Sequence, residues 1–170
     1  VCHVFVDRDA DLNMAEEICF NAKVQRPGTC NAMETMLVDG KVAGKFLHSM
    51  IKRFKKAKVK MKGDARTRRY DKAVSAAVDN DYYIEYVDKI MNIKGVKDMD
   101  AALDHIAKYS SAHTETIVTE DYENAMRFLK EVDSSSVMVN ASTRFADVFQ
   151  YGLGAEMGIS TDKIHARGPM

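Results

Sequence analysis

The chain has 170 residues, of which 46% are hydrophobic, and its 25 basic and 25 acidic side chains give a formal net charge of zero. This size and composition predict one sizeable core, in one domain with room for an appendage. Zero net charge excludes a general attraction of the whole chain to nucleic acid or anionic membranes, and no apolar run approaches the roughly 20 residues needed to span a bilayer. We expect a soluble, cytoplasmic protein without nucleic-acid or membrane partners.

The three cysteines are odd in number and follow no pairing pattern, which is typical of a reducing compartment. They also lack the spacing of a zinc site, so no metal is expected. The chain opens with Val1 and not with methionine, and no leader with a basic and then an apolar part is visible. We therefore expect this chain to be a piece of a longer protein.

In the first half, residues 3–6 form a predicted strand, and Asp11 stands where a helix cap belongs. Residues 33–38 form the next predicted strand, and Asp39 and Gly40 a turn. Apolar residues at helical spacing follow each of the two strands. They are Leu12, Ala15, Ile18, Cys19 and Ala22 after the first, and Val42, Phe46, Leu47, Met50, Ile51 and Phe54 after the second.

Residues 63–81 lose this periodicity and predict an irregular connection, and residues 82–96 predict short strands. Asp98 is expected to cap a helix with an inner face of Met99, Ala102, Leu103 and Ile106. A strand over residues 114–118, a helix capped by Thr119 and a strand over residues 137–139 complete the series. The stripe expected for that last helix is Tyr122, Ala125, Met126, Leu129 and Val132.

The alternation of strands and helices predicts an α/β fold with an open, mainly parallel sheet flanked by helices. One helix face is basic and continues into the following segment. Two interpretations are open: a nucleic-acid patch, or a solvated helix face followed by an alternating strand. The absence of interleaved aromatic residues for base stacking favours the solvated face. The basic residues are Lys45, Lys52, Arg53, Lys55, Lys56, Lys58, Lys60, Lys62, Arg66, Arg68 and Arg69.

The turn over residues 25–32 carries Cys30. Pro27 and Gly28 stop the preceding helix, so the backbone amides after the turn are available to receive a carbonyl oxygen. A lone cysteine is either a small buried hydrophobe or a nucleophile, and its position alone does not decide between them. Near the other end, residues 151–158 contain three glycines, which suggests a loop that approaches a ligand closely. Their spacing matches neither a P-loop nor the dinucleotide fingerprint.

Several of these motifs, taken together, resemble gamma-glutamyl phosphate reductase, a family of the aldehyde dehydrogenase superfamily. They are Arg26-Pro27-Gly28-Thr29-Cys30-Asn31-Ala32-Met33-Glu34-Thr35, the stretch 96–117 with His105-Ile106 and His113-Thr114-Glu115, Asn140-Ala141-Ser142-Thr143-Arg144-Phe145, Gly152-Leu153-Gly154-Ala155-Glu156-Met157-Gly158 and His165-Ala166-Arg167-Gly168-Pro169-Met170. The resemblance covers nearly the whole chain.

The resemblance implies an aldehyde dehydrogenase-like catalytic domain over residues 1–138. Residues 139–170 would be a return segment with a substrate loop and oligomer or inter-domain contacts. The N-terminal half that holds the dinucleotide in this family has no counterpart here, so the isolated chain is expected to be inactive. The implied activity is NADPH-dependent reduction of gamma-glutamyl phosphate in proline biosynthesis, by a protein that is a homo-oligomer at full length.

The resemblance also implies site residues. Cys30 would be the nucleophile that forms a thioester, with the Cys30 and Asn31 amides holding the oxyanion. Arg144, with Ser142 and Thr143, would bind the substrate phosphate or alpha-carboxylate; otherwise Arg144 ties the strand end to a neighbouring carboxylate. Glu156 would meet the substrate ammonium or brace the glycine loop. Two alternatives to the reductase are a non-catalytic interaction or oligomerisation module, and a reductase of another acyl substrate.

Overall fold

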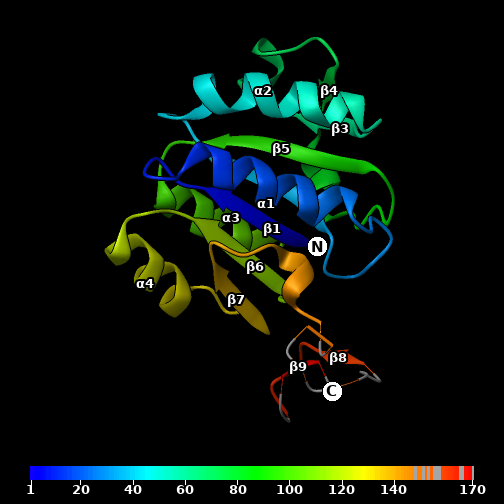
Figure 1. Ribbon diagram of the computed structural model, residues 1–170, viewed down its shortest axis with the longest axis vertical. Coiled ribbons are helices and arrows are strands. Elements are labelled where there is room, and N and C mark those ends of the chain that lie inside the picture. The colour runs from blue at the N-terminus through cyan, green and yellow to red at the C-terminus, as the bar shows by residue number, and fades with distance from the viewer. Residues whose placement is uncertain (148, 151, 153, 155–157, 165–166, 170) are drawn as a thin grey trace.

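The computed structural model describes residues 1–147, 149–150, 152, 154, 158–164 and 167–169. Its centre is a sheet of seven strands in the order β4-β3-β5-β2-β1-β6-β7, and every pairing in it is parallel (Figure 1). The strands are β1 (Cys2–Val6), β2 (Met33–Asp39), β3 (Lys60–Gly63), β4 (Val74–Ala76), β5 (Ile90–Val96), β6 (Thr114–Val118) and β7 (Ser136–Val139). The predicted α/β class and parallel sheet are confirmed.

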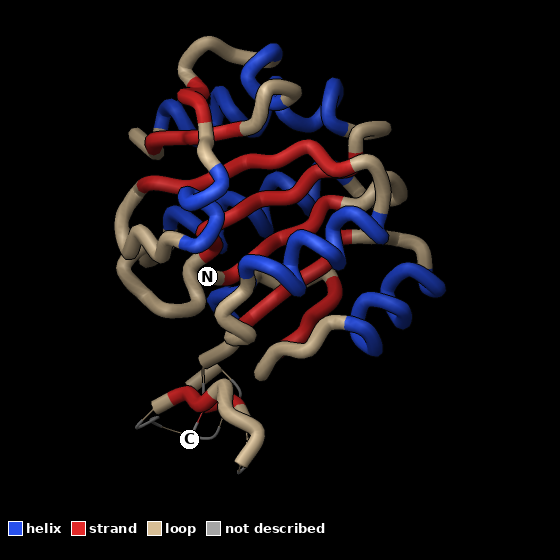
Figure 2. The backbone as a smooth tube through the Cα atoms, turned by 180° about the vertical axis from the view of Figure 1, so that it is seen from behind, coloured by secondary structure: helices blue, strands red, loops and turns tan. Residues whose placement is uncertain are grey.

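Four helices cover the two faces of the sheet: α1 (Leu12–Val24), α2 (Ala43–Lys56), α3 (Met99–Tyr109) and α4 (Tyr122–Glu131). Helices α1 and α2 pack against one face, where Phe46 and Phe54 meet Val4 and Met36 in one apolar cluster. Helices α3 and α4 cover the other face (Figure 2). Their inward side chains pack in a second apolar cluster with Phe5. Because successive strand residues point to opposite faces, the central strands are buried on both sides.

Local signals place the helix starts. The Asp11 carboxylate accepts hydrogen bonds from the Asn13 and Met14 amides at 2.8 and 3.1 Å, and Asp98 accepts one from the Ala101 amide at 3.0 Å. These contacts satisfy first-turn amides that have no partner within the helix. Both predicted caps are thus confirmed, because cap chemistry acts over three residues and is readable locally.

The prediction that Thr119 caps α4 is wrong. Asp121 is the cap, with its carboxylate accepting from the Asn124 amide at 2.7 Å. The Thr119 hydroxyl is used elsewhere: it donates to Asp7 at 2.8 Å and accepts from the Asp121 amide. The hydroxyl of Thr119 therefore joins the ends of β1 and β6 and does not start the helix.

The segment 63–96 also differs from expectation. It contains the short strand β4 and two 3₁₀ turns, Thr67–Arg69 and Asp79–Tyr83, and then the single strand β5 in place of several short strands. Strand β5 is inserted between β2 and β3. Its central position is set by pairing with strands distant in sequence, which local patterns do not report.

The chain beyond β7 contains a 3₁₀ turn (Thr143–Phe145) and a two-stranded antiparallel pair, β8 (Ile159–Ser160) and β9 (Gly168–Pro169), below the main sheet in Figure 1. The Ser135 hydroxyl donates to the Ser160 carbonyl at 2.8 Å, and Arg167 pairs with Asp133 at 2.8 Å. The division at residue 138 stays a prediction. In the described part of the chain, no helix is both long and apolar enough to cross a bilayer.

Candidate active site

The thiol of Cys30 is exposed on the loop between α1 and β2. Two tight turns shape this loop, because the Thr29 amide donates to the Arg26 carbonyl at 3.3 Å and the Ala32 amide to the Thr29 carbonyl at 3.0 Å. From below, the buried Cys2 thiol donates to the Cys30 carbonyl at 3.2 Å. The backbone of Cys30 is therefore held while its side chain faces solvent.

The other two thiols have a different environment. Cys2 and Cys19 are fully buried, and burial raises the pKa of each thiol above its usual range. A buried, protonated thiol is a poor nucleophile because the thiolate is the reactive form. Among the three cysteines, only Cys30 has the exposure that a nucleophile needs.

A hydrogen-bonded network joins the Cys30 loop to the segment after β7. Arg144 donates through Nη1 to the Asn31 side-chain oxygen and through Nε to the Gln25 side-chain oxygen at 2.8 Å. The Asn31 side-chain amide donates to the Ala146 carbonyl at 2.9 Å. The structure thus brings together Cys30, Asn31 and Arg144, which the sequence analysis selected from opposite ends of the chain.

The other predicted substrate residues lie differently. Ser142 is buried, and its Oγ accepts from the Arg144 amide at 3.3 Å at the start of the 3₁₀ turn. Thr143 is also buried, and its hydroxyl has no hydrogen-bond partner in the part of the chain that the structure describes. Glu156 lies outside the described residues. The substrate roles of these three residues stay predictions.

Next to Arg144 the surface is hollowed into a cavity of about 220 Å³. Asn21, Gln25, Arg144, Phe145 and Gln150 line it. A guanidinium with amide side chains is suited to bind a carboxylate or phosphate, because each can donate hydrogen bonds to its oxygens.

A buried ion pair brackets the loop that carries Cys30. Lys23 at the end of α1 and Glu34 at the start of β2 are both inaccessible to solvent, and Lys23 Nζ lies 3.0 Å from Glu34 Oε2. Burial lowers the pKa of Lys23 and raises that of Glu34, while their mutual attraction opposes both shifts. Glu34 also accepts from the Val87 amide at 3.3 Å. The pair therefore ties both ends of the loop to the segment before β5.

Sequence reasoning did not select Lys23, Glu34 or Gln25. A charged residue inside an apolar pattern, such as Glu34 within β2, is a signal for a buried partner. The sequence does not identify Lys23 as that partner, because this depends on how α1 packs against β2 in the tertiary structure.

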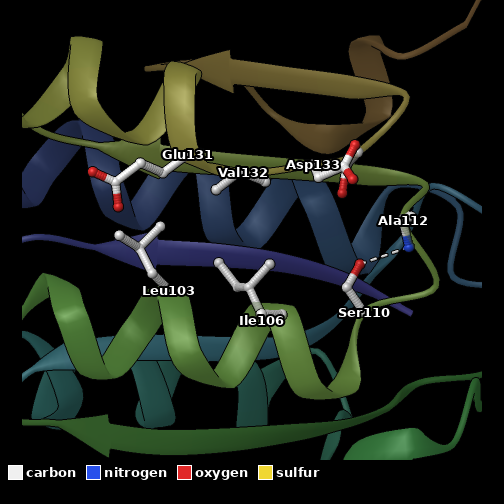
Figure 3. A pocket seen from close by; sticks show the side chains of 9 residues that line it. Leu103, Ile106, Ser110, Ala112, Glu131, Val132 and Asp133 are labelled. Atoms are coloured by element: carbon white, nitrogen blue, oxygen red, sulfur yellow. Dashed lines mark hydrogen bonds between the residues drawn. The ribbon is translucent and has the colours of Figure 1, made fainter.

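A second cavity, of about 330 Å³, lies between α3 and the end of α4 (Figure 3). Its walls are apolar at Leu103, Ile106 and Val132, with Glu131 and Asp133 at the ends. It contains no cysteine, and so the candidate site for covalent chemistry is at Cys30. Among the described residues, no group of three or more metal-binding side chains is placed to hold a metal ion.

The arrangement of sheet and helices can be compared with solved structures. An acetylating aldehyde dehydrogenase from Geobacillus thermoglucosidasius superposes with a TM-score of 0.72 at 16% identity, over 98% of this chain and 47% of that one. The chain therefore has an aldehyde dehydrogenase-like fold.

The sequence comparison is more specific. Gamma-glutamyl phosphate reductase from Thermodesulfovibrio yellowstonii is 65% identical over 170 residues, which are 100% of this chain and 41% of that protein. The crystal structure of gamma-glutamyl phosphate reductase from Thermotoga maritima has a TM-score of 0.96 at 50% identity, over 99% of this chain and 41% of that one. No protein-family model matches the chain. The resemblance to the gamma-glutamyl phosphate reductase family is confirmed along the whole chain, which spans about two fifths of these relatives' length.

Proposed function

We propose that this chain supplies the cysteine-bearing catalytic part of a gamma-glutamyl phosphate reductase of proline biosynthesis. The reaction reduces L-glutamyl 5-phosphate to L-glutamate 5-semialdehyde and releases phosphate. The observation that carries the proposal is an exposed Cys30 beside the contact between Asn31 and Arg144, within a chain 65% identical to a protein of that name.

In the proposed reaction the Cys30 thiolate attacks the acyl carbon of the substrate. A carbon–sulfur bond forms, the bond to the phosphate oxygen breaks, and phosphate leaves with the electron pair. Addition of a hydride to the resulting thioester gives a thiohemiacetal. Cleavage of its carbon–sulfur bond then releases the aldehyde and returns the thiolate. The Cys30 and Asn31 amides would stabilise the oxyanion, a contribution of about 3 kcal/mol per donor in enzymes that use one.

NADPH would supply the hydride when bound. The described residues contain no glycine-rich turn of the dinucleotide-fingerprint type between a strand and a helix. We propose that most of the coenzyme site lies in the part of the full-length relatives that this chain does not match. The steps assigned to this chain are therefore substrate binding and acyl transfer to sulfur. As part of this proposal, the 170 residues alone do not catalyse the reduction. The full-length protein is proposed to be a homo-oligomer in the cytoplasm.

Arg144 is proposed to hold the phosphate or the alpha-carboxylate of the substrate at the adjoining cavity. Its observed contacts with Asn31 and Gln25 support the proposal that it positions the Cys30 loop. Both roles place the Arg144 guanidinium at the site. In the first role the guanidinium contacts the substrate directly, and in the second it contacts only the Cys30 loop.

The test is the pH dependence of alkylation at Cys2, Cys19 and Cys30, resolved by peptide mass spectrometry on the folded chain. We expect Cys30 to react at least tenfold faster at pH 7, with an apparent pKa below about 8.5, while burial keeps the other two thiols protonated. Cys30→Ser is the control that removes the fast phase. Equal rates at all three cysteines would contradict the proposal and favour a non-catalytic module with this fold.

The second arm of the test supplies gamma-glutamyl phosphate formed in situ from glutamate and ATP by an added glutamate kinase. A hydroxylamine-sensitive mass increase on the Cys30 peptide is the expected result, because hydroxylamine cleaves thioesters. An increase with acetyl phosphate but not with gamma-glutamyl phosphate would instead indicate a reductase of another acyl substrate.

A further inference from the structure

A cavity of about 430 Å³ lies at the edge of the sheet opposite Cys30. Cys30 comes just before β2, whereas Gly40, which lines the cavity, comes just after it. Because β2 has seven residues, at about 3.3 Å each, the two places are about 20 Å apart. The proposed acyl transfer at Cys30 therefore does not use this cavity.

The cavity lies at the ends of two neighbouring strands, and the helices that follow these strands lie on opposite faces of the sheet. Strand β2 leads into α2 on one face of the sheet, and β5 leads into α3 on the other face. Gly40 and Gly95 line the cavity where these two strands end. Ligands of open parallel sheets bind at such switch points, outside the carboxyl ends of the strands.

The start of α2 gives this crevice a positive end. Helix α2 begins at Ala43, which lines the cavity. No side chain caps the helix, and its first turn contains no acidic residue. Its first amides therefore carry the partial positive charge of a helix N-terminus. The Asp39 carboxylate accepts from the Lys41 amide at 2.8 Å just before the helix, and its charge is balanced by Arg8 at 2.9 Å.

Two arginines add full charges. Arg66 and Arg69 line the cavity and are exposed, and neither forms an ion pair with any described residue. Three other members of the basic run do form ion pairs: Arg53, Lys55 and Lys62 pair with Glu17, Asp71 and Asp81. One carboxylate, that of Asp64, lies near Gly95, and it accepts from the Thr67 amide at 2.9 Å. Asp64 thus anchors the loop that presents the arginines.

A buried hydroxyl provides independent evidence. Thr67 lines the cavity and is inaccessible to solvent, yet its Oγ1 has no hydrogen-bond partner within the described ranges. A Cβ added at Gly63 would lie 3.0 Å from the Thr67 methyl, so the methyl packs against Gly63 and the hydroxyl is turned away from that strand. Burying a hydroxyl without a partner is costly, and a small shift of the Thr67 side chain into the cavity would let a ligand oxygen satisfy it.

We propose that this cavity binds the phosphate group of a small phosphate-bearing molecule. The amides at the start of α2 and the Arg66 and Arg69 guanidinium groups would surround the phosphate, with the Thr67 hydroxyl beneath it. Tyr70, 37% exposed, lines the same cavity and is the aromatic side chain there for the rest of a phosphate ester to contact. The proposal is independent of the reaction proposed at Cys30.

The test is titration of the ¹⁵N-labelled 170-residue chain with inorganic phosphate and, separately, with AMP, each against chloride at equal ionic strength. Saturable amide shifts are expected at Gly40, Ala43, Gly44 and Thr67. A higher affinity for AMP than for phosphate would identify a phosphate ester as the ligand. Equal affinities would identify free phosphate, and both results support the site. Shifts that do not saturate with either probe, or that spread over all basic segments, would overturn it.

Variants separate the cavity from general charge. Arg66→Gln/Arg69→Gln should weaken binding at least tenfold, and Thr67→Val, which keeps the shape of the side chain, about threefold or more. The matched control is Lys52→Gln/Lys56→Gln, which removes the same charge from the solvent face of α2 and should change affinity less than twofold. A fingerprint spectrum with native dispersion confirms that each variant is folded. Equal losses in both double variants would overturn the proposal.

Discussion

At the scale of single residues, the candidate site depends on groups whose exposure differs although their chemistry is the same. Cys30 is exposed while Cys2 and Cys19 are buried, and burial raises the pKa of both buried thiols. Exposure therefore selects one nucleophile from three chemically identical side chains. The buried pair formed by Lys23 and Glu34 is also needed for the site, because it holds the two ends of the loop that carries Cys30.

Lys23→Met leaves the Glu34 carboxylate buried without a counter-charge. We expect a loss of about 3 kcal/mol in the free energy of unfolding, because removing one partner of a buried pair strands the other charge. Lys23→Met/Glu34→Met removes both charges and should be more stable than the single variant. Urea unfolding followed by circular dichroism measures these differences.

The control for this series is Lys52→Met on the solvent face of α2, expected to change stability by less than about 0.5 kcal/mol. A Lys23→Met loss no larger than that of Lys52→Met would show that the buried pair does not stabilise the fold.

At the scale of elements, α4 shows how a helix can be predicted correctly while its buried face is not. Apolar spacing placed Tyr122, Met126 and Leu129 toward the core, but they are 76%, 46% and 39% exposed. Phe128 is instead inaccessible and packs in the cluster around Phe5 and Ile117. Helix α4 lies beside the edge strand β7, so only a narrow strip of it faces the core (Figure 1).

Two neighbouring substitutions on α4 test this orientation. Phe128→Ala should cost about 3 kcal/mol or more, because it empties a closely packed position, whereas Leu129→Ala should cost less than about 1 kcal/mol. Thermal and urea unfolding of the two variants provide the comparison. If Leu129→Ala were the more damaging substitution, α4 would be rotated about its axis relative to the structure described here.

At the scale of the whole molecule, a seven-stranded sheet with helices on both faces is formed by a chain that spans about two fifths of its relatives' length. The chain provides a thiol, a guanidinium and a closed hydrophobic core, and it matches 41% of the length of a named reductase. The described residues provide no dinucleotide site of the fingerprint type. Folding and the proposed acyl transfer can therefore be tested separately from the proposed reduction.

We expect the 170-residue chain to show no NADPH oxidation with gamma-glutamyl phosphate above a blank without protein. The reason is that hydride transfer needs the coenzyme held against the thioester. Absorbance at the NADPH band is the readout, and the full-length Thermodesulfovibrio yellowstonii relative is the matched positive control. Turnover by the chain alone would mean that its own residues hold the coenzyme.

Local signals in the sequence determined much of the fold: the period of apolar residues gave the helices and central strands, and carboxylates at Asp11 and Asp98 gave two helix starts. These features depend on neighbours within about four residues, so they can be read from the chain. The turn after Pro27 and Gly28 also drew attention to Cys30, while the site roles of Cys30, Asn31 and Arg144 came through resemblance to a family and not through spacing.

Tertiary structure alone decided the rest. It inserted β5 between β2 and β3, turned Phe128 and not Leu129 inward, joined Lys23 to Glu34, and placed Arg144 against Asn31. It also gathered Arg66, Thr67 and Arg69 at the start of α2. Each of these depends on how separate elements pack, and the free energy of that packing is shared among residues too distant in sequence for any local pattern to record.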